Sequence, residues 1–350
     1  SDSTKFAIVA KFLVDEDRYL TSFTFFDVDL IKNGLPVYAY WILPAMPYMM
    51  SVFFRIFGVS DFSVIATSYF FFFLTVLFTF LLAKKLFGKT VGILSSLVVL
   101  INQNFLDYAK NGASETLFMF EIVAIPYLML LKKRWATITS LSLLVIMYFT
   151  RPQAFIFIAG YILFYLLLNF KTKKALLYFT AVLLFGLIFD RLVLLPLNGK
   201  YFLYSITGRG VHAVTQHSQY VAVSDVLRGV EKQPASLVLT IKKTGTNLFN
   251  FYRSLPNIVN PYLFTFFILS PLILFKKRQE RAFLGTTFFT AFLSFLVPAL
   301  TIPFYRYIHP VLPLIYITGI ASLVTIVTRI SNLHFPISKQ IPMTKIQITK

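Results

Sequence analysis

The chain has 350 residues, of which 57% are hydrophobic, 18% aromatic and only 13% charged, whereas an ordinary soluble domain carries about 25% charged residues. A mean hydropathy of +0.74 and 41 phenylalanines give more apolar surface than one core of this length can bury, which excludes a soluble globular enzyme. The absence of cysteine excludes disulfides, thiol nucleophiles and thiolate metal sites. The composition therefore indicates helices that face a lipid bilayer.

The first segment, residues 1–61, lacks an apolar run long enough to cross a membrane. Residues 19–32 and 42–57 contain shorter apolar runs, separated by a turn at Gly34, and we predict two interfacial helices there. This segment has neither a basic region nor a signal peptide. We therefore expect a first transmembrane helix upstream of Ser1, with residues 6–14 as its outer end or as the loop that follows it.

Further along the chain, nine windows are apolar enough to cross a membrane, which takes about 20 residues per helix. Two of them are short and would cross when tilted or flanked by long basic side chains. The windows are residues 62–83, 91–105, 116–131, 136–149, 154–170, 175–197, 261–275, 282–300 and 308–328. We predict an all-α polytopic membrane protein with five divisions: an outer loop at 1–61, a transmembrane core at 62–197, a second outer loop at 198–260, C-terminal helices at 261–328 and a tail at 329–350.

Basic residues cluster at every second turn between these windows. The clusters lie at residues 84–89, 132–134, 171–174 and 276–281, and only Glu280 among them is acidic. The positive-inside rule places these turns and the C-terminal tail in the cytoplasm. The formal net charge of +19 then reflects topology, so we expect no nucleic-acid partner.

Three consecutive acids, Asp15, Glu16 and Asp17, stand where the first segment meets the outer face of the membrane. A carboxylate at that depth is partly desolvated, which raises its basicity and makes it a usable general base. The alternative is a solvated acidic turn.

The short outer turn at residues 107–116 contains Asp107, Lys110 and Glu115. Ser114 is placed to cap the next helix, and Glu115 would lie in its first turn. Capping does not account for Lys110, because a cation on the outer side indicates either an anionic ligand or contact with lipid headgroups.

Two further outer turns each carry one arginine, Arg151 and Arg306, and Tyr305 precedes the second. Arginine binds phosphate through two parallel hydrogen bonds, so these residues together with Lys110 could form a site for a lipid-linked phosphate. The alternative for each is contact with the membrane surface. The intramembrane acids Glu121 and Asp190 are further functional candidates because charge is costly in lipid.

The order of these features resembles the multi-pass GT-C glycosyltransferases. The acidic pair Asp15-Glu16, two interfacial helices, the Phe87-Gly88 turn and the run from Lys110 to Phe118 carry the resemblance. It is closest to the bacterial branch related to protein mannosyltransferases and to the lipid A aminoarabinose transferase. It covers roughly residues 12–151, with the Arg306-Tyr307 turn as a late landmark, and implies a GT-C-like helix bundle.

The resemblance implies transfer of a sugar from a polyprenyl-phosphate carrier to an envelope glycan, lipid or protein, at the extracytoplasmic face of a bacterial or archaeal cell membrane. It implies that Asp15 is the catalytic base, with Glu16 beside it, and that the reaction inverts the anomeric centre. Lys110, Arg151 and Arg306 would stabilise the departing phosphate. We assign Asp107, Glu115 and Tyr305 to the same substrate site.

No cofactor is required by these residues. A divalent cation, Mg²⁺ or Mn²⁺, would bind if Asp15, Glu16, Asp107 and Glu115 converge. Two alternative functions stay open, namely a polysaccharide polymerase or ligase of another multi-pass family and a lipid or solute transporter. Glu121 and Asp190 favour the transporter, whereas the concentration of charge at the outer turns favours the transferase.

Overall fold

The computed structural model describes residues 2–22, 34–39, 42–169, 237–273, 275 and 277–334, together with a few positions between 177 and 192. Within these residues the only strands are β1 (Leu20–Thr21) and β2 (Val37–Tyr38), which pair antiparallel with Leu20 opposite Tyr38. The remaining regular structure is helical, which confirms the predicted all-α class.

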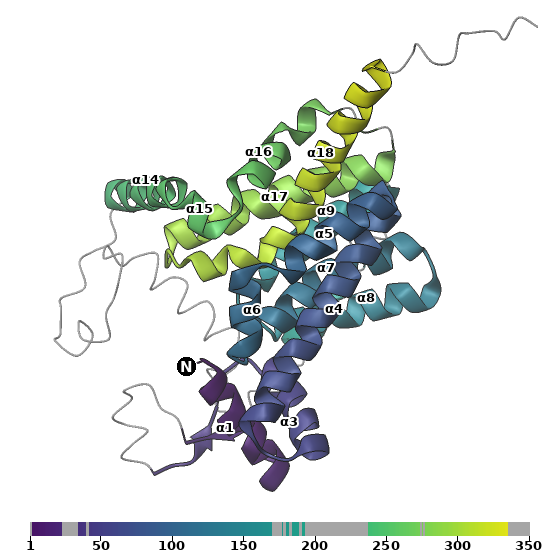
Figure 1. Ribbon diagram of the computed structural model, residues 1–350. Coiled ribbons are helices and arrows are strands. Elements are labelled where there is room, and N and C mark those ends of the chain that lie inside the picture. Colours follow the sequence, from purple (N-terminus) through teal and green to yellow (C-terminus); the bar gives the residue numbers. More distant parts are fainter. Residues whose placement is uncertain are drawn as a thin grey trace, which may run out of the picture.

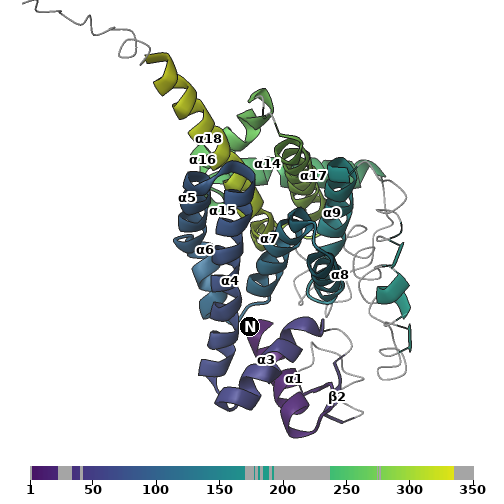
Figure 2. The same cartoon turned by 90° about the vertical axis from the view of Figure 1, so that its right-hand side faces the viewer.

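The helices form an elongated bundle (Figures 1 and 2). The short helices α1 and α3 lie at one end of it, and the last turns of α18 extend from the other end. The α-helices are α1 (Asp2–Asp15), α3 (Ala45–Phe57), α4 (Asp61–Phe87), α5 (Lys89–Leu100), α6 (Gln103–Lys110), α7 (Glu115–Leu131), α8 (Arg134–Tyr148), α9 (Ala154–Asn169), α14 (Leu237–Arg253), α15 (Leu255–Ile258), α16 (Pro261–Leu269), α17 (Arg278–Leu300) and α18 (Leu312–His334). Three 3₁₀ turns complete the described structure: η2 (Ser270–Leu272), η3 (Tyr305–Tyr307) and η4 (His309–Val311).

Eight of the nine apolar windows coincide with these helices. Window 91–105 comprises α5 and the start of α6, which meet at an angle of 56°, and window 175–197 lies mostly outside the described residues. By length and composition, three described helices could cross a membrane, or four if α5 and α6 count as one broken span. Four others are apolar but only 10–17 residues long. The number of nine spans therefore stays a prediction.

The two interfacial helices fare differently. The helix expected in the second is present as α3, which begins at Ala45 directly after Pro44, a residue that suits the start of a helix, and its position at the interface stays a prediction. The first is wrong at its beginning, because Leu20 and Thr21 form β1, and residues 23–33 lie outside the described part. Tyr19 is buried beside this strand and donates a hydrogen bond to the carbonyl of Ile42 at 2.7 Å, which ties β1 to the approach to α3. Burial raises the pKa of the Tyr19 phenol.

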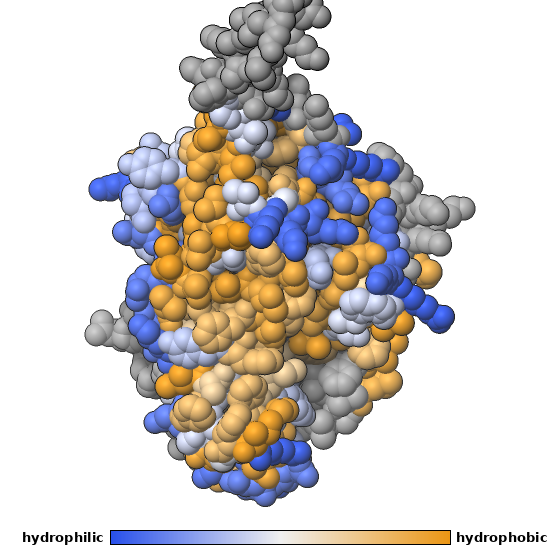
Figure 3. Space-filling model, turned by 45° about the vertical axis from the view of Figure 1, so that its right-hand side comes forward, coloured by the Kyte–Doolittle hydropathy of each residue, from blue (hydrophilic) through white to orange (hydrophobic). Residues whose placement is uncertain are grey.

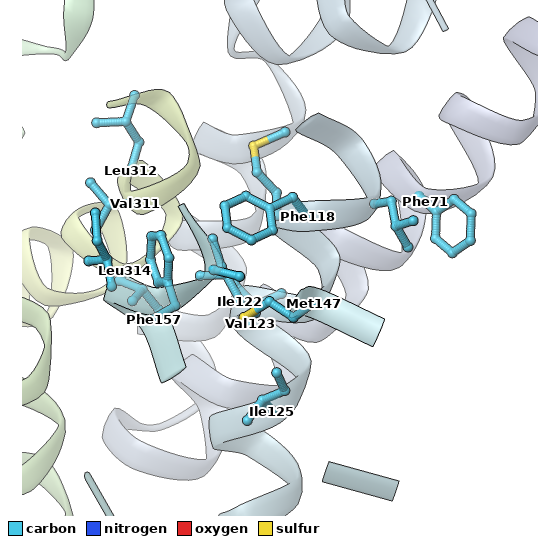
Figure 4. Close-up of a cluster of buried hydrophobic side chains, with 14 of the residues drawn as sticks. Phe71, Phe118, Ile122, Val123, Ile125, Met147, Phe157, Val311, Leu312 and Leu314 are labelled. Atoms are coloured by element: carbon cyan, nitrogen blue, oxygen red, sulfur yellow. The ribbon is translucent and has the colours of Figure 1, made fainter. Parts of the chain in front are cut away.

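Helix α7 is the centre of the bundle, and 13 of its 17 residues are buried. The ring of Phe118 meets Phe157 of α9 edge to face, with the centroids 5.4 Å apart. Figure 4 shows this cluster, in which α7 side chains lie with Phe157 and with Leu314 of α18. Because α7 is enclosed by its neighbours, its two ends are fixed relative to the rest of the molecule.

The outside of the bundle is apolar. On α4, Phe62 is 65% exposed and Phe73 is 58% exposed, and on α5, Leu97 is 47% exposed. Figure 3 shows apolar side chains in a broad band across one face, with hydrophilic residues gathered mostly towards its edges. An apolar surface of this extent fits a lipid environment, and the protein is an integral, multi-pass membrane protein.

Close helix packing at Gly319 gives a test of this arrangement. A Cβ atom at Gly319 of α18 would lie 2.5 Å from the carbonyl oxygen of Leu263 in α16. Because a backbone atom cannot move without the whole helix, we expect Gly319→Ala to destabilise the protein by about 1–3 kcal/mol. The measurement is the thermal unfolding midpoint in detergent.

Gly285→Ala on α17 is the matched control. The nearest atom to its new Cβ would be Leu167 Cδ1 at 3.6 Å, an ordinary contact with a flexible side chain. Equal unfolding midpoints for the two variants would contradict the packing of α16 against α18.

Candidate active site

A buried carboxylate between two arginines is the main polar feature at one end of α7. Glu115, the first residue of α7, is fully buried. Its Oε1 atom lies 2.8 Å from Nη1 of Arg151 and accepts a hydrogen bond from Nε of Arg306 at 2.7 Å, with Nη2 of Arg306 also in contact. The Arg151 side chain is 8% exposed and that of Arg306 is 36% exposed. Two guanidinium groups thus share one carboxylate, which leaves the cluster with an excess of positive charge.

The turn between α6 and α7 sets the position of Glu115. Gly112 takes a positive φ of 63°, and a Cβ atom there would lie 2.5 Å from Val64 of α4 and 3.1 Å from Ser3 of α1. Only glycine fits such a conformation at such close approach. The turn is therefore held between α1 and α4, and Glu115 follows in the first turn of α7, where the helix dipole favours a carboxylate.

Ser114 differs from its prediction. It occupies the position before α7, yet its side chain makes no capping hydrogen bond. Instead its hydroxyl oxygen accepts a hydrogen bond from Nη1 of Arg151 at 3.2 Å. The arginine competes for this oxygen because the turn at Arg151 is packed directly against the start of α7.

Arg151 is fixed on several sides by the turn between α8 and α9. Its Nε donates to Oε1 of Gln153 at 2.9 Å, and its guanidinium lies 5.8 Å from the ring centre of Tyr307. The preceding residue, Thr150, donates to Oε1 of Glu121 at 2.8 Å. The intramembrane acid Glu121 thus anchors the turn that carries Arg151 to the interior of α7.

Arg306 is positioned from the other side by α14 and α15. Asn247 of α14 donates to the carbonyl of Ala299, at the end of α17, at 2.8 Å. Tyr305 donates to the hydroxyl of Ser254 at 2.8 Å. These contacts hold both ends of the segment from α17 to Arg306, and they direct Tyr305 towards α15, which starts after Ser254.

Two uncharged residues beside the cluster were missed by the sequence analysis. The hydroxyl of Tyr108 lies 2.5 Å from Nδ1 of His309, and His309 is only 5% exposed. Both belong to the outer turns that the charged residues had marked. Their pairing has no local signal, because 201 positions separate them in sequence.

The remaining predicted residues lie apart from the cluster. Asp107 accepts a hydrogen bond from Gln103 at 2.8 Å, one turn away on α6. Lys110 is exposed at the end of α6. Both stay close to the Glu115 turn in sequence.

Asp15 and Glu16 lie elsewhere. Both are exposed at the C-terminal end of α1, whereas Ser3, at its N-terminal end, lies beside Gly112. At about 1.5 Å per residue, Asp15 is roughly 18 Å further along α1 than Ser3. The neighbouring Asp17 forms an exposed ion pair with Arg55 at 2.9 Å.

Asp15 and Glu16 thus do not meet the condition set for a divalent cation, which was convergence with Asp107 and Glu115. The direction of α1 carries its acidic end away from the turn that holds Glu115. Among the described residues, no group of three or more histidines and acids could hold a metal ion.

Comparison with known proteins gives the context of this site. Residues 43–190, which include Glu115 and Arg151, match the family model described as dolichyl-phosphate-mannose-protein mannosyltransferase. An uncharacterized protein of Aquifex aeolicus (strain VF5) is 28% identical over 287 residues, which cover 79% of this chain and 50% of that protein.

Two solved structures are similar over nearly the whole chain. ArnT from Cupriavidus metallidurans bound to undecaprenyl phosphate has a TM-score of 0.55 at 14% identity, covering 98% of this chain and 62% of ArnT. The Archaeoglobus fulgidus oligosaccharyltransferase in complex with Zn and sulfate has a TM-score of 0.53 at 15% identity, covering 95% of this chain and 50% of that one. The chain thus spans between half and two thirds of the length of these relatives.

The protein therefore has the fold of the GT-C membrane glycosyltransferases. The resemblance predicted from the sequence is confirmed. Within that fold, the match to the mannosyltransferase family model runs from the approach to α3 past the end of α9.

The buried ion cluster leads to a stability prediction. Removing the carboxylate in Glu115→Ala leaves Arg151 buried without its counter-charge, and breaking such a pair costs about 3–5 kcal/mol. We expect a clearly lower thermal unfolding midpoint in detergent. Asp17→Ala is the control, because it breaks an ion pair whose Asp17 and Arg55 side chains are 86% and 58% exposed and that solvent already screens. Similar midpoints for both variants would mean that Glu115 is not buried with the arginines.

Proposed function

We propose that the protein is a membrane glycosyltransferase that takes its sugar from a polyprenyl-phosphate-linked donor. The cluster of Glu115, Arg151 and Arg306 carries this proposal, because it brings two arginines and one buried carboxylate together from three distant segments and so has an excess of positive charge. The fold supports it, as do two names among the relatives: a family named for a dolichyl-phosphate sugar and an ArnT structure with undecaprenyl phosphate bound.

The chemistry of the cluster suits a departing phosphate. Arg306 is partly exposed and can turn N–H groups towards a phosphate, while Glu115 keeps both guanidinium groups in place. As the acceptor hydroxyl attacks the anomeric carbon, the bond to the phosphate oxygen breaks and the lipid phosphate leaves with the electron pair. Arg151 and Arg306 stabilise that charge, Lys110 supplies a cation at the rim, and one displacement inverts the anomeric centre.

The proton of the acceptor hydroxyl needs a base. The resemblance assigns this role to Asp15, with Glu16 beside it. Both are exposed at the C-terminal end of α1. We therefore treat Asp15 and Glu16 as two candidates that one experiment separates.

The activity assay uses membranes that contain the protein, a panel of polyprenyl-phosphate sugars and an envelope extract as acceptor. We expect release of free lipid phosphate from one donor, and a loss on the order of 10²-fold in Arg306→Ala, because a stabilising donor to the leaving group is removed. Arg134→Ala, an exposed arginine at the start of α8, is the matched control. Failure of the wild type to consume any donor would overturn the proposed function.

The same assay compares Asp15→Asn with Glu16→Gln. The variant that lacks the base should lose roughly 10²–10⁴-fold in turnover, and the other should keep most of it. A loss confined to Asp15→Asn would support the resemblance, and a loss confined to Glu16→Gln would assign the base to Glu16. Full activity in both would remove α1 from the proton transfer.

We also propose that the cluster faces the extracytoplasmic side and that the acceptor is a glycan, lipid or protein of a bacterial or archaeal envelope. The basic residues at the C-terminal ends of α4 and α7 support this orientation through the positive-inside rule, because the cluster lies at the N-terminal end of α7. The C-terminus would then be cytoplasmic.

Cysteine labelling tests the orientation, because the chain contains no native cysteine. Lys110 is exposed at the end of α6, before α7 begins, and Lys133 is exposed beyond the other end of α7. In intact cells, Lys110→Cys should react with a membrane-impermeant thiol reagent and Lys133→Cys only after permeabilisation. The reverse pattern would invert the proposed topology.

A further inference from the structure

His309 presents a buried nitrogen that nothing in the described part of the chain satisfies. Its ring is 5% exposed, and its Nδ1 is occupied by the Tyr108 hydroxyl at 2.5 Å. Its Nε2 has no hydrogen-bond partner among the described residues. Buried polar atoms are nearly always paired in native proteins, so an unpaired one at a site indicates a place for a ligand.

The partner on Nδ1 determines which proton the ring carries. If Tyr108 donates its hydroxyl proton to Nδ1, both atoms are satisfied, and the neutral ring bears its own proton on Nε2. If Nδ1 donates instead, the Tyr108 hydroxyl proton also needs an acceptor, and two groups are left without partners. A doubly protonated ring is disfavoured because the ring is buried. The first arrangement leaves the fewest unpaired groups, so Nε2 is a hydrogen-bond donor.

His309 lies beside the ion cluster. His309 begins η4, directly after the 3₁₀ turn η3 that carries Arg306. The charges of Glu115 and Arg306 both act on the His309 ring, and those of Glu115, Arg306 and Arg151 act on Tyr108. The site thus combines two guanidinium groups with a neutral N–H donor, a set suited to an anion that has several oxygens.

We propose that Nε2 of His309 donates a hydrogen bond to a phosphate oxygen of the lipid-linked donor, and that Tyr108 is a positioning residue that keeps the proton on Nε2. This inference rests on the proposed function and adds a neutral contact to its cationic ones. The arginines attract the phosphate by charge, and the neutral N–H adds a hydrogen bond that depends on direction. Together they discriminate the carrier phosphate from other anions.

The binding test uses the protein in nanodiscs with a polyprenyl monophosphate as probe and the matching polyprenol as the phosphate-free control. The key pair is His309→Gln, whose amide N–H reaches the place of Nε2, and His309→Asn, whose amide reaches only that of Nδ1. We expect His309→Asn to bind the phosphate about tenfold or more weakly, and His309→Gln to bind within about threefold of the wild type.

Tyr108→Phe has its own control in Tyr316→Phe. Both remove a phenol hydroxyl from a partly buried hydrogen bond, but the Tyr316 hydroxyl, near the start of α18, accepts from Asn102 at 3.0 Å. We expect Tyr108→Phe to weaken phosphate binding and Tyr316→Phe to leave it unchanged. Nitrogen-15 spectra of labelled histidine, with His309 assigned by its absence in His309→Gln, should show a neutral ring protonated on Nε2 whose signal moves when the phosphate is added.

The outcomes are distinct. The role of His309 would be overturned, and the proposed function left intact, by either of two results. One is that His309→Asn binds the phosphate as tightly as the wild type does. The other is that the His309 signal does not move when the phosphate is added. A response to the polyprenol as strong as to the phosphate would assign the site to the lipid chain and overturn the phosphate contact. If the wild type neither binds the phosphate nor consumes any donor, the proposed function fails and this inference fails with it.

Discussion

The carboxylate of Glu115 cannot be buried unless positive charge is buried with it. Removing an ion of this kind from water costs several kcal/mol even after relaxation of the protein, and Glu115 has no exposed surface. Its Oε1 atom therefore requires Arg151 and Arg306, which come from two other turns of the chain. The meeting of the α6–α7 turn, the α8–α9 turn and η3 follows from this one electrostatic requirement.

The requirement can be met because α7 is enclosed by its neighbours. Its apolar residues pack against α4, α8 and α9, while α4 and α5 carry an exposed apolar surface that fits lipid. A helix satisfies its own backbone hydrogen bonds, so it can lie in an apolar environment. The ion cluster lies where α7 begins. Further along α7, Glu121 accepts a hydrogen bond from Thr150 and so fixes the turn that carries Arg151.

The proposed activity places a lipid-linked phosphate where charge and direction are both available. Arg306 is the more exposed of the two arginines and is held in place by contacts from α14 and α15. His309 follows it by one 3₁₀ turn, so a shift of this segment would displace both proposed phosphate contacts together. The segments around α14 thus bear on the proposed binding of the donor through the position of Arg306.

The sequence by itself determined the membrane class, eight of the helical segments and the outer turns that hold Glu115, Arg151 and Arg306, because apolar length and charge placement are local properties. Only the tertiary structure decided that Glu115 pairs with both arginines, that Ser114 serves Arg151 rather than the helix, and that Asp15 lies away from them. It also revealed the contact between Tyr108 and His309. The physical reason is separation: Glu115 and Arg306 are 191 positions apart, and no local pattern encodes a contact that depends on how α7 packs between its neighbours.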